Sequence, residues 1–270
     1  MNAPEKIELP DTQALPDMRA TPIQKVGIKG LRYPVALRTS AGEVQHTIAE
    51  FAMYVGLAHD VKGTHMSRFV EILEAMSGPL DIRGLHLLHA QMLERLGAET
   101  GRIEISFPYF IRKSAPVSGV SSLLDYQARL TAETKSVRRT RVTLALTAPV
   151  TSLCPCSKKI SDYGTHNQRS HITINADIVG EMTLEELAQV AEEEASCEVF
   201  GLLKRPDEKW VTERAYDNPK FVEDLVRDIA LRMKRDPRVG HFNVSSENFE
   251  SIHNHSAYAE VEGVGAALPD

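Results

Sequence analysis

Residues 142–149 have the sequence VTLALTAP, in which the apolar residues Val142, Leu144 and Leu146 alternate with small or polar ones. Side chains of an extended strand point alternately to its two faces, so this alternation predicts a strand with one buried face. Residues 172–176, with the sequence ITINA, repeat the pattern. The sequence therefore predicts two strands joined by a loop that contains two of the three cysteines.

Two helices and two further strands are expected after this pair of strands. Thr183 and Glu186 have the spacing of a capping box, which begins the first helix. Asn218 as N-cap and Pro219 at the first helical position predict the start of the second helix. Its apolar stripe consists of Val222, Leu225, Val226, Ile229 and Met233. Alternating apolar residues near the C-terminus predict the last two strands, so the second half has the predicted order ββααββ.

The first half of the chain has the same predicted order. Residues 26–38 and 43–57 are rich in β-branched and aromatic residues and are joined by a short turn, as in a hairpin. Two helices, which are expected to begin near Ser67 and Arg83, come next and carry apolar stripes. Two alternating segments then predict strands, which completes a second ββααββ pattern.

We therefore predict an α+β protein of two tandem ββααββ units, residues 23–136 and 137–270, which resemble an internal duplication without sequence identity. The boundary between the units is expected near residues 135–139. Residues 1–22 contain four prolines among acidic and small polar residues. Such a segment has too little apolar surface to offset the entropy lost on ordering, so it is predicted to be a disordered arm.

Composition excludes several classes of protein. The net charge is −6 over 270 residues, whereas nucleic-acid-binding proteins carry a basic excess, so no nucleic acid is expected as a partner. No apolar run approaches the roughly 20 residues of a membrane span, and the start of the chain is not a signal peptide. Three cysteines, an odd number, do not make a disulfide framework, so a reducing compartment, the cytoplasm, is expected.

The loop after the first quoted strand carries the residues with the clearest chemistry. Residues 154–158 have the sequence CPCSK, and His166 and His171 follow. Thiolate and imidazole together suit zinc and other first-row metals, whereas a disulfide between Cys154 and Cys156 would be strained. Because the chain has no C-x-x-C pair, a closed zinc-finger site is disfavoured and an open, catalytic metal site is favoured. The roles of Cys156 and His171 stay undecided.

A catalytic metal needs a third protein ligand from elsewhere in the chain. Acidic residues cluster in the polar segment 205–210, which is expected to lie between the two helices of the second half, and Glu208 is the best candidate there. Cys197 is not a candidate ligand, because a free cysteine after an amphipathic run is usually a small core residue.

Two further groups could act on a ligand. His253 and His255, spaced i, i+2 between two predicted strands, would face the same side in extended chain. A histidine in a turn is often only a solvated polar residue, but the nearby metal cluster favours a catalytic role for His253. Glu223 lies early in a helix, where the default interpretation is a carboxylate that stabilises the helix dipole. It could also accept two parallel hydrogen bonds from adjacent N–H donors, such as a guanine edge offers.

Basic residues occur in two places suited to an anion. Lys158, Lys159 and Arg169 flank the cysteine cluster, although a solvated loop explains them equally well. Lys62 and Arg68 belong to a polar turn before a helix N-terminus, which is a favourable place for phosphate.

Four motifs together closely resemble the type IB GTP cyclohydrolases. They are CPCSK with the downstream histidines, KGTHMSRF at residues 62–69, LLKRPDEK at 202–209 and SIHNH at 251–255. The resemblance covers nearly the whole chain after the arm. It implies the tunnelling fold, with antiparallel sheets and helices on one face, and homotetramers with active sites at subunit interfaces. The reaction would be GTP plus water giving 7,8-dihydroneopterin triphosphate and formate, the first step of tetrahydrofolate synthesis.

The resemblance also implies roles for individual residues. Cys154, His166 and Glu208 match the family's metal ligands, for one divalent ion per active site that could be zinc, manganese or iron. Glu223 matches the purine anchor, and His253 matches the histidine that transfers protons. The triphosphate would then be bound by Lys62, Arg68, Lys158 and Arg169, which would converge only across a subunit interface. The type IA enzymes carry a C-x-x-H ligand motif, which this chain lacks.

Two other interpretations remain open. A nitrile reductase of the same fold would use Cys154 as a covalent nucleophile, bind a deazaguanine through a similar glutamate and need a nicotinamide cofactor instead of a metal. A non-enzymatic purine-binding protein would use the cysteine and histidine cluster as a closed structural metal site. Production of formate from GTP distinguishes the cyclohydrolase from both.

Overall fold

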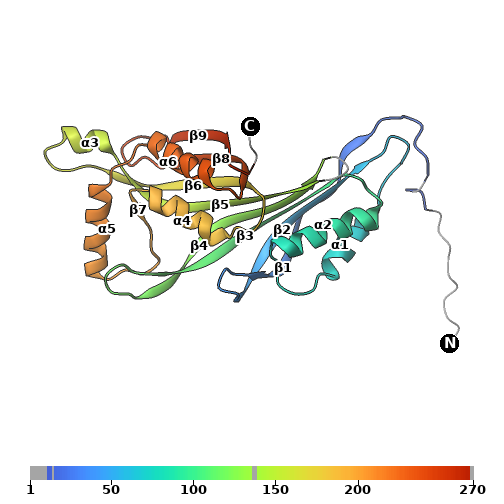
Figure 1. Cartoon of the computed structure of the whole chain (residues 1–270), viewed down its shortest axis with the longest axis horizontal. Helices are drawn as coiled ribbons and strands as arrows, with labels where there is room; N and C mark the ends of the chain where they lie inside the picture. The colour runs from blue at the N-terminus through green and yellow to red at the C-terminus, as the bar shows by residue number, and fades with distance from the viewer. Residues whose placement is uncertain (1–10, 14, 136–138, 268–270) are drawn as a thin grey trace.

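The computed structural model describes residues 11–13, 15–135 and 139–267. Within them, nine strands form one sheet in which every neighbouring pair is antiparallel. Eight strands follow the order β1-β2-β3-β4-β5-β6-β8-β9, and the short strand β7 pairs with β5. Figure 1 shows this long twisted sheet with helices α1 and α2 at one end and α4 and α6 at the other. The predicted α+β class with antiparallel strands is confirmed.

The first half of the chain has the predicted order of two strands, two helices and two strands. Their bounds are β1 Ile23–Arg38, β2 Val44–Leu57, α1 Met66–Glu74, α2 Ile82–Leu96, β3 Gly101–Ser114 and β4 Ser121–Thr134. Asp81 caps α2 by accepting a hydrogen bond from the Gly84 amide, and Gly97 ends it in the left-handed conformation that glycine adopts without a steric penalty.

The second half departs from the predicted ββααββ order. Its expected elements are β5 Thr140–Leu153, β6 Asn167–Ile178, α4 Leu184–Glu194, α6 Val222–Arg235, β8 Val239–Asn248 and β9 Ala257–Val264. It also contains α3 Pro155–Ile160, β7 Cys197–Glu198 and α5 Arg205–Asp217. The capping box of Thr183 and Glu186 is confirmed at the start of α4. The second half is therefore not a plain repeat of the first.

Two predictions about this half are wrong for a common reason. The segment 205–210, expected to be a polar connection, is the start of α5, and Asn218, expected to begin a helix, ends α5 as its C-cap. Helix α6 begins instead after Phe221, whose amide donates to the Asp224 carboxylate. Helix α5 buries only Asp207 and Ala215, and its few apolar residues do not form the long apolar stripe by which helices are predicted.

One continuous row of side chains shows where the core lies. Phe51, Ile105, Leu130, Leu144, Ala176 and Phe242 are successive partners across β2, β3, β4, β5, β6 and β8. All six are buried. Paired residues share a face of the sheet, so this row places the buried face, and the helices that cover it, on one side of both halves.

The other face of the sheet is polar. Cross-strand pairs there include Thr143 with Asp177, at 2.7 Å, and Thr147 with Thr173, at 2.9 Å between hydroxyl oxygens. The sheet is thus buried by helices on one side only, as antiparallel sheets commonly are.

The predicted arm and unit boundary fall partly outside the described residues, which omit 1–10, 14 and 136–138. Both stay predictions. In the described part of the arm, Pro16 forms a bridge with Val61 and Gln13 donates to the Thr64 carbonyl at 3.0 Å. Among the helices that the structure describes, none combines the length and apolar composition needed to cross a membrane.

Candidate metal centre and active site

The pairing of β5 with β6 brings Cys154 and His166 together. The ladder between these strands ends at the pair Leu153 and Asn167. One step further, the Cys154 amide donates to the His166 carbonyl at 3.2 Å. Opposed residues of antiparallel chains have Cβ atoms about 5 Å apart. The thiol and the imidazole are therefore attached to neighbouring backbone positions. The structure therefore brings together two of the three predicted metal ligands.

The short helix α3 fixes the thiol. Cys154 is its N-cap, and the Sγ atom accepts from the Ser157 amide at 3.5 Å. The Thr165 hydroxyl donates to the Cys154 carbonyl at 2.9 Å and lies 2.6 Å from the Ser157 hydroxyl. These bonds close the loop from residue 154 to residue 166, so that both candidate ligands are held by local hydrogen bonds.

Hydrogen bonds also orient the imidazole of His166. Its Nδ1 lies 2.9 Å from Oε1 of Gln168, a buried side chain, and 3.3 Å from the Ser251 hydroxyl. Because an amide oxygen only accepts, this contact is a hydrogen bond in the tautomer that carries its proton on Nδ1 and leaves the Nε2 lone pair free. This is the arrangement in which a histidine binds a metal ion, with its other nitrogen held by a neighbouring acceptor.

The connection between β8 and β9 brings His253 to the same end of the sheet. The Phe249 amide donates to the Arg169 carbonyl at 2.9 Å, and the Phe249 ring packs edge-on against His171 with centroids 4.8 Å apart. Two residues after the Ser251 contact lies His253, whose ring stacks on that of His255 at 5.1 Å. Both rings are exposed and lie side by side, but residues 251–255 form bends and not the extended chain on which the prediction was based.

Glu223 also lies at this end. The Lys220 amide donates to the Leu153 carbonyl at 3.1 Å, next to Cys154, and Glu223 follows in the first turn of α6. Its carboxylate is exposed and beside the buried stripe of the helix, as predicted. Its role as a purine anchor stays a prediction.

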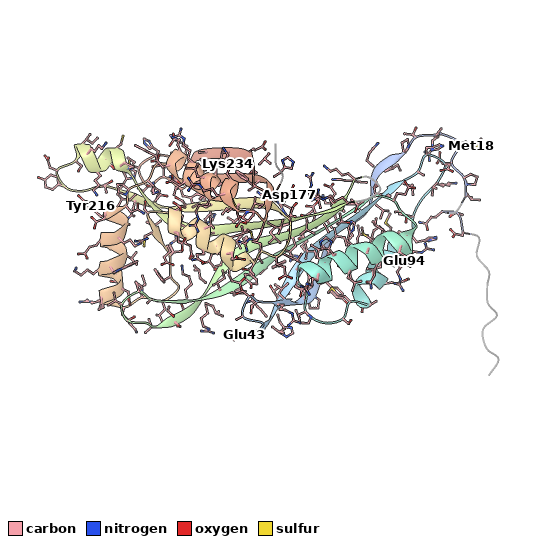
Figure 2. All side chains as sticks on the ribbon, in the orientation of Figure 1. Met18, Glu43, Glu94, Asp177, Tyr216 and Lys234 are labelled. Carbon is pink, nitrogen blue, oxygen red and sulfur yellow. The ribbon has the colours of Figure 1, made fainter. Side chains whose placement is uncertain are left out.

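Glu208 does not join Cys154 and His166 within this chain. Among the described residues, no group of three His, Cys, Asp or Glu side chains is placed to hold a metal ion. Lys158 of α3 donates to the carbonyl of Tyr216, near the end of α5 (Figure 2). Glu208 lies eight residues earlier on α5, about 12 Å along the axis at 1.5 Å per residue.

The four predicted triphosphate contacts are divided between the two ends of the sheet. Lys62 and Arg68 precede and begin α1, which Figure 1 shows at the end opposite α3. The Nζ atom of Lys158 lies over the Tyr216 ring, 3.9 Å from its centroid, and this cation–π contact connects α3 to α5. Arg169 is exposed beside His171, and burial together with this guanidinium lowers the pKa of the His171 imidazole. One chain therefore does not bring these cations together.

The three cysteines are free and differ in their surroundings. Cys156 is exposed, Cys154 is half-buried and Cys197 is fully buried. Cys197 packs with Leu153 and Ala215, and burial raises the pKa of its thiol to about 11. The prediction that Cys197 is a core residue is confirmed.

Sequence reasoning missed the residues that hold the predicted ligands. Gln168 and Ser251 orient His166, and the buried hydroxyls of Ser152 and Ser170, 2.7 Å apart, cross-link β5 to β6 just before the site. Only Gln168 had a local signal, because its spacing of two residues from His166 places both side chains on one face of a strand. The Ser251 contact spans 85 residues and leaves no local pattern.

The sequence matches the family described as type I GTP cyclohydrolase FolE2 over residues 9–259. The chain belongs to this family. GTP cyclohydrolase FolE2 1 of Dechloromonas aromatica is 67% identical over 97% of this chain and 99% of its own length. GTP cyclohydrolase FolE2 of Paraburkholderia xenovorans is 60% identical over 94% of each chain. The resemblance seen in the motifs is thus confirmed at the level of the FolE2 family.

Solved structures similar to this FolE2 chain share its fold at low identity. Uricase from Arthrobacter globiformis has a TM-score of 0.54 at 9% identity, over 92% of this chain and 95% of its own. A highly active mutant of Bacillus sp. TB-90 urate oxidase has a TM-score of 0.53 at 10% identity, over 90% of this chain and 100% of its own. The fold is therefore shared with the urate oxidases.

The surroundings of the three thiols predict their reactivity. Iodoacetamide at pH 8, applied to the chelator-treated native protein, should label Cys156 fastest and Cys154 more slowly. It should leave Cys197 unlabelled until the protein is unfolded, because that thiol is buried and protonated at this pH. Mass spectrometry of tryptic peptides measures the three rates. Labelling of native Cys197 at a rate near that of Cys156 would contradict this packing.

Proposed function

We propose that this chain, a GTP cyclohydrolase of the FolE2 family, depends on a bound metal ion to convert GTP and water to 7,8-dihydroneopterin triphosphate and formate. Membership of the FolE2 family supports the activity. The observation that carries the metal-dependent mechanism is the backbone pairing of Cys154 with His166, which places a thiol and an oriented imidazole side by side. This reaction would be the first step of tetrahydrofolate synthesis, in the cytoplasm, where the three free cysteines stay reduced.

The ligand set fits a single divalent metal such as zinc, manganese or iron. Cys154 offers sulfur, Nε2 of His166 offers nitrogen and Glu208 offers oxygen, a mixture that first-row metals accept. When bound with an open position, such an ion lowers the pKa of water toward about 7 and so supplies the nucleophile for hydrolysis at carbon 8 of guanine.

The third ligand in this proposal comes from a second copy of the chain. Glu208 is separated from Cys154 within one chain, while the end of the sheet that carries Cys154 has unusual apolar exposure. Tyr163 is 100% exposed, Ile160 is 84% exposed and Ile252 is 63% exposed. Large apolar side chains so exposed around a site are typical of surfaces that a partner covers. A homotetramer with active sites between subunits would cover this end and would supply Glu208.

The same interface would assemble the substrate site. Glu223 would accept two parallel N–H bonds from the guanine edge, which fixes carbon 8 relative to the metal. The triphosphate, with a charge of about −4, needs several cations, since burying a charge without partners is costly. Arg169 and Lys158 from one chain, with Lys62 and Arg68 from another, would supply them.

His253 is proposed to transfer protons during ring opening and release of formate. An imidazole side chain can both accept and donate a proton near neutral pH. Its exposed position on the β8–β9 connection, close to the Ser251 contact with His166, lets it approach a base held by Glu223.

At the level of architecture, we propose that the fold shared with the urate oxidases is the tunnelling fold, and that the chain is of the type IB group. The first half has the ββααββ order. In the second half, α3, β7 and α5 would be additions to the same unit, and two of these, α3 and α5, lie beside the proposed site.

Loss of the thiol ligand should abolish turnover without unfolding the protein. Cys154→Ala is expected to lower the rate of formate release from GTP by at least about 10³-fold, since metal activation of water is worth several kcal/mol. The half-buried position predicts a change of less than about 1 kcal/mol in the free energy of unfolding. Cys156→Ala, which removes the exposed neighbouring thiol, is the matched control.

The assay follows formate and pterin fluorescence, without oxygen, on protein loaded with Zn²⁺ or Mn²⁺. Normal turnover by Cys154→Ala would remove this residue from the mechanism. A metal-free protein that consumed a nicotinamide cofactor and became alkylated at Cys154 would instead support the nitrile reductase. A protein that unfolds on metal removal and never releases formate would support a structural metal site.

Glu223 should determine recognition of the guanine base. Glu223→Ala should raise the KM for GTP about 10- to 100-fold, because a bidentate bond to a carboxylate contributes about 1.5–3 kcal/mol. It should also remove the preference for GTP over inosine triphosphate, which lacks the exocyclic amino group. Glu43→Ala, an exposed acid in the β1–β2 turn (Figure 2), should change neither. An unchanged preference for GTP in Glu223→Ala would refute the anchor.

A further inference from the structure

Asp207, next to the proposed ligand Glu208, has an unusual environment. It is the one acidic residue in the described parts of the chain that is classed as buried, and its exposed fraction is 0%. It has no ion-pair partner among the described residues. Burial of an unpaired carboxylate is costly unless hydrogen-bond donors surround it. The burial of Asp207 on a mostly exposed helix therefore needs an explanation beyond helix propensity.

Four hydrogen bonds satisfy the Asp207 carboxylate. Oδ1 accepts from the amides of Val117 and Ser118, both at 2.8 Å. Oδ2 accepts from the Ser118 hydroxyl at 2.6 Å and from the Lys204 amide at 2.8 Å. The Lys204 bond caps the first turn of α5, whereas the other three come from the turn between β3 and β4, about 90 residues earlier in the chain. The carboxylate thus clamps the start of α5 to this turn.

A second contact fixes the approach to the helix. Gly201, in the segment before α5, passes so close to β4 that an added Cβ atom would lie 2.7 Å from the Leu123 carbonyl and 2.9 Å from the Ser122 hydroxyl. Only glycine permits this approach. The start of α5 is therefore attached to the first residues of β4 before Lys204 and to the β3–β4 turn after it (Figure 1).

The side chain of Glu208 makes no polar contact with the described residues, and only its backbone is held in place. Its side chain is exposed and has no hydrogen bond or ion pair among the described contacts, while its carbonyl accepts from the Thr212 hydroxyl at 2.8 Å. The ammonium group of the neighbouring Lys209 donates to both carboxylate oxygens of Glu213, at 2.7 Å and 2.8 Å. A rigid backbone with a free carboxylate is the arrangement expected of a ligand that is presented to another molecule.

We propose that Asp207 is a positioning residue, which locks the first turn of α5 to the β3–β4 turn so that Glu208 is presented to the metal in one orientation. This inference rests on the proposed function, in which Glu208 is the oxygen ligand. Ordinary capping does not require burial: Glu186, at the equivalent position of α4, caps Thr183 while partly exposed and paired with Arg238. Burial against a distant turn adds orientation relative to the sheet.

The test compares Asp207→Asn with Glu186→Gln, the matched capping variant on α4. Residues that hold a metal ligand typically change metal affinity by 10- to 100-fold when substituted. Asp207→Asn should therefore raise the dissociation constant for Zn²⁺, measured by competition with a fluorescent chelator, at least about 10-fold. It should lower kcat at limiting metal and leave the KM for GTP unchanged. Glu186→Gln should lower the melting temperature about as much as Asp207→Asn does, because both remove a cap. It should leave the Zn²⁺ dissociation constant unchanged.

Two further variants keep the result decisive. Ser118→Ala removes one donor from the clamp and should weaken Zn²⁺ binding in the same direction but less, so it decides the question if Asp207→Asn does not fold. The proposal would be overturned if Asp207→Asn and Ser118→Ala both bound Zn²⁺ with wild-type affinity. It would also be overturned if they lost no more Zn²⁺ affinity than Glu186→Gln does. Glu208→Gln separates the two claims: if it too retains Zn²⁺ and activity, the proposed ligand set is wrong, whereas if only Glu208→Gln loses both, the clamp alone is wrong.

Discussion

The site depends on the register between β5 and β6. Leu144 pairs with Ala176 in the core, and the same ladder, continued without a slip, ends with Cys154 opposite His166. A shift of one residue would turn every buried side chain of β6 to the polar face, so the core that stabilises the sheet also fixes which histidine faces the thiol. The buried Ser152–Ser170 hydroxyl bond reinforces the register close to the site. The chemistry is thus set by a pairing that folding already requires.

Three segments meet at the end of this ladder, two of them from distant parts of the sequence. Helix α3 begins at Cys154, the start of α6 bonds to Leu153 through the Lys220 amide, and the β8–β9 connection bonds to Arg169 through the Phe249 amide. The attachments of α6 and of the β8–β9 connection are backbone hydrogen bonds, so they constrain position without constraining the exposed side chains that follow. Those side chains, Glu223 and His253 among them, remain free to bind a substrate. The acidic ligand and half of the basic residues lie elsewhere, which makes a second copy of the chain part of the proposed site.

Local patterns were enough to predict most strands, the capping box of α4 and the core position of Cys197. Helix α5 was missed because it buries only two residues, and its position depends on contacts such as that of Asp207 with Ser118, 89 residues away. Asn218 followed by Pro219 has the chemistry of a helix start, yet Asn218 ends α5, and its side chain donates to the Ala195 carbonyl instead. Contacts between distant segments, and between subunits, leave no periodic signal in a sequence, so Gln168, Ser251 and the placement of Glu208 required the structure.

The most direct test of a metal site shared between subunits is complementation between two inactive chains. Cys154→Ala and Glu208→Gln would be co-expressed with different tags, and the mixed oligomer isolated and assayed for formate release from GTP. In a symmetric assembly, about one in four randomly formed interfaces joins an intact cysteine from one chain to an intact glutamate from the other, so about a quarter of the wild-type rate should return. If all three ligands came from one chain, no intact site could form, and a mixed oligomer without activity would contradict the account.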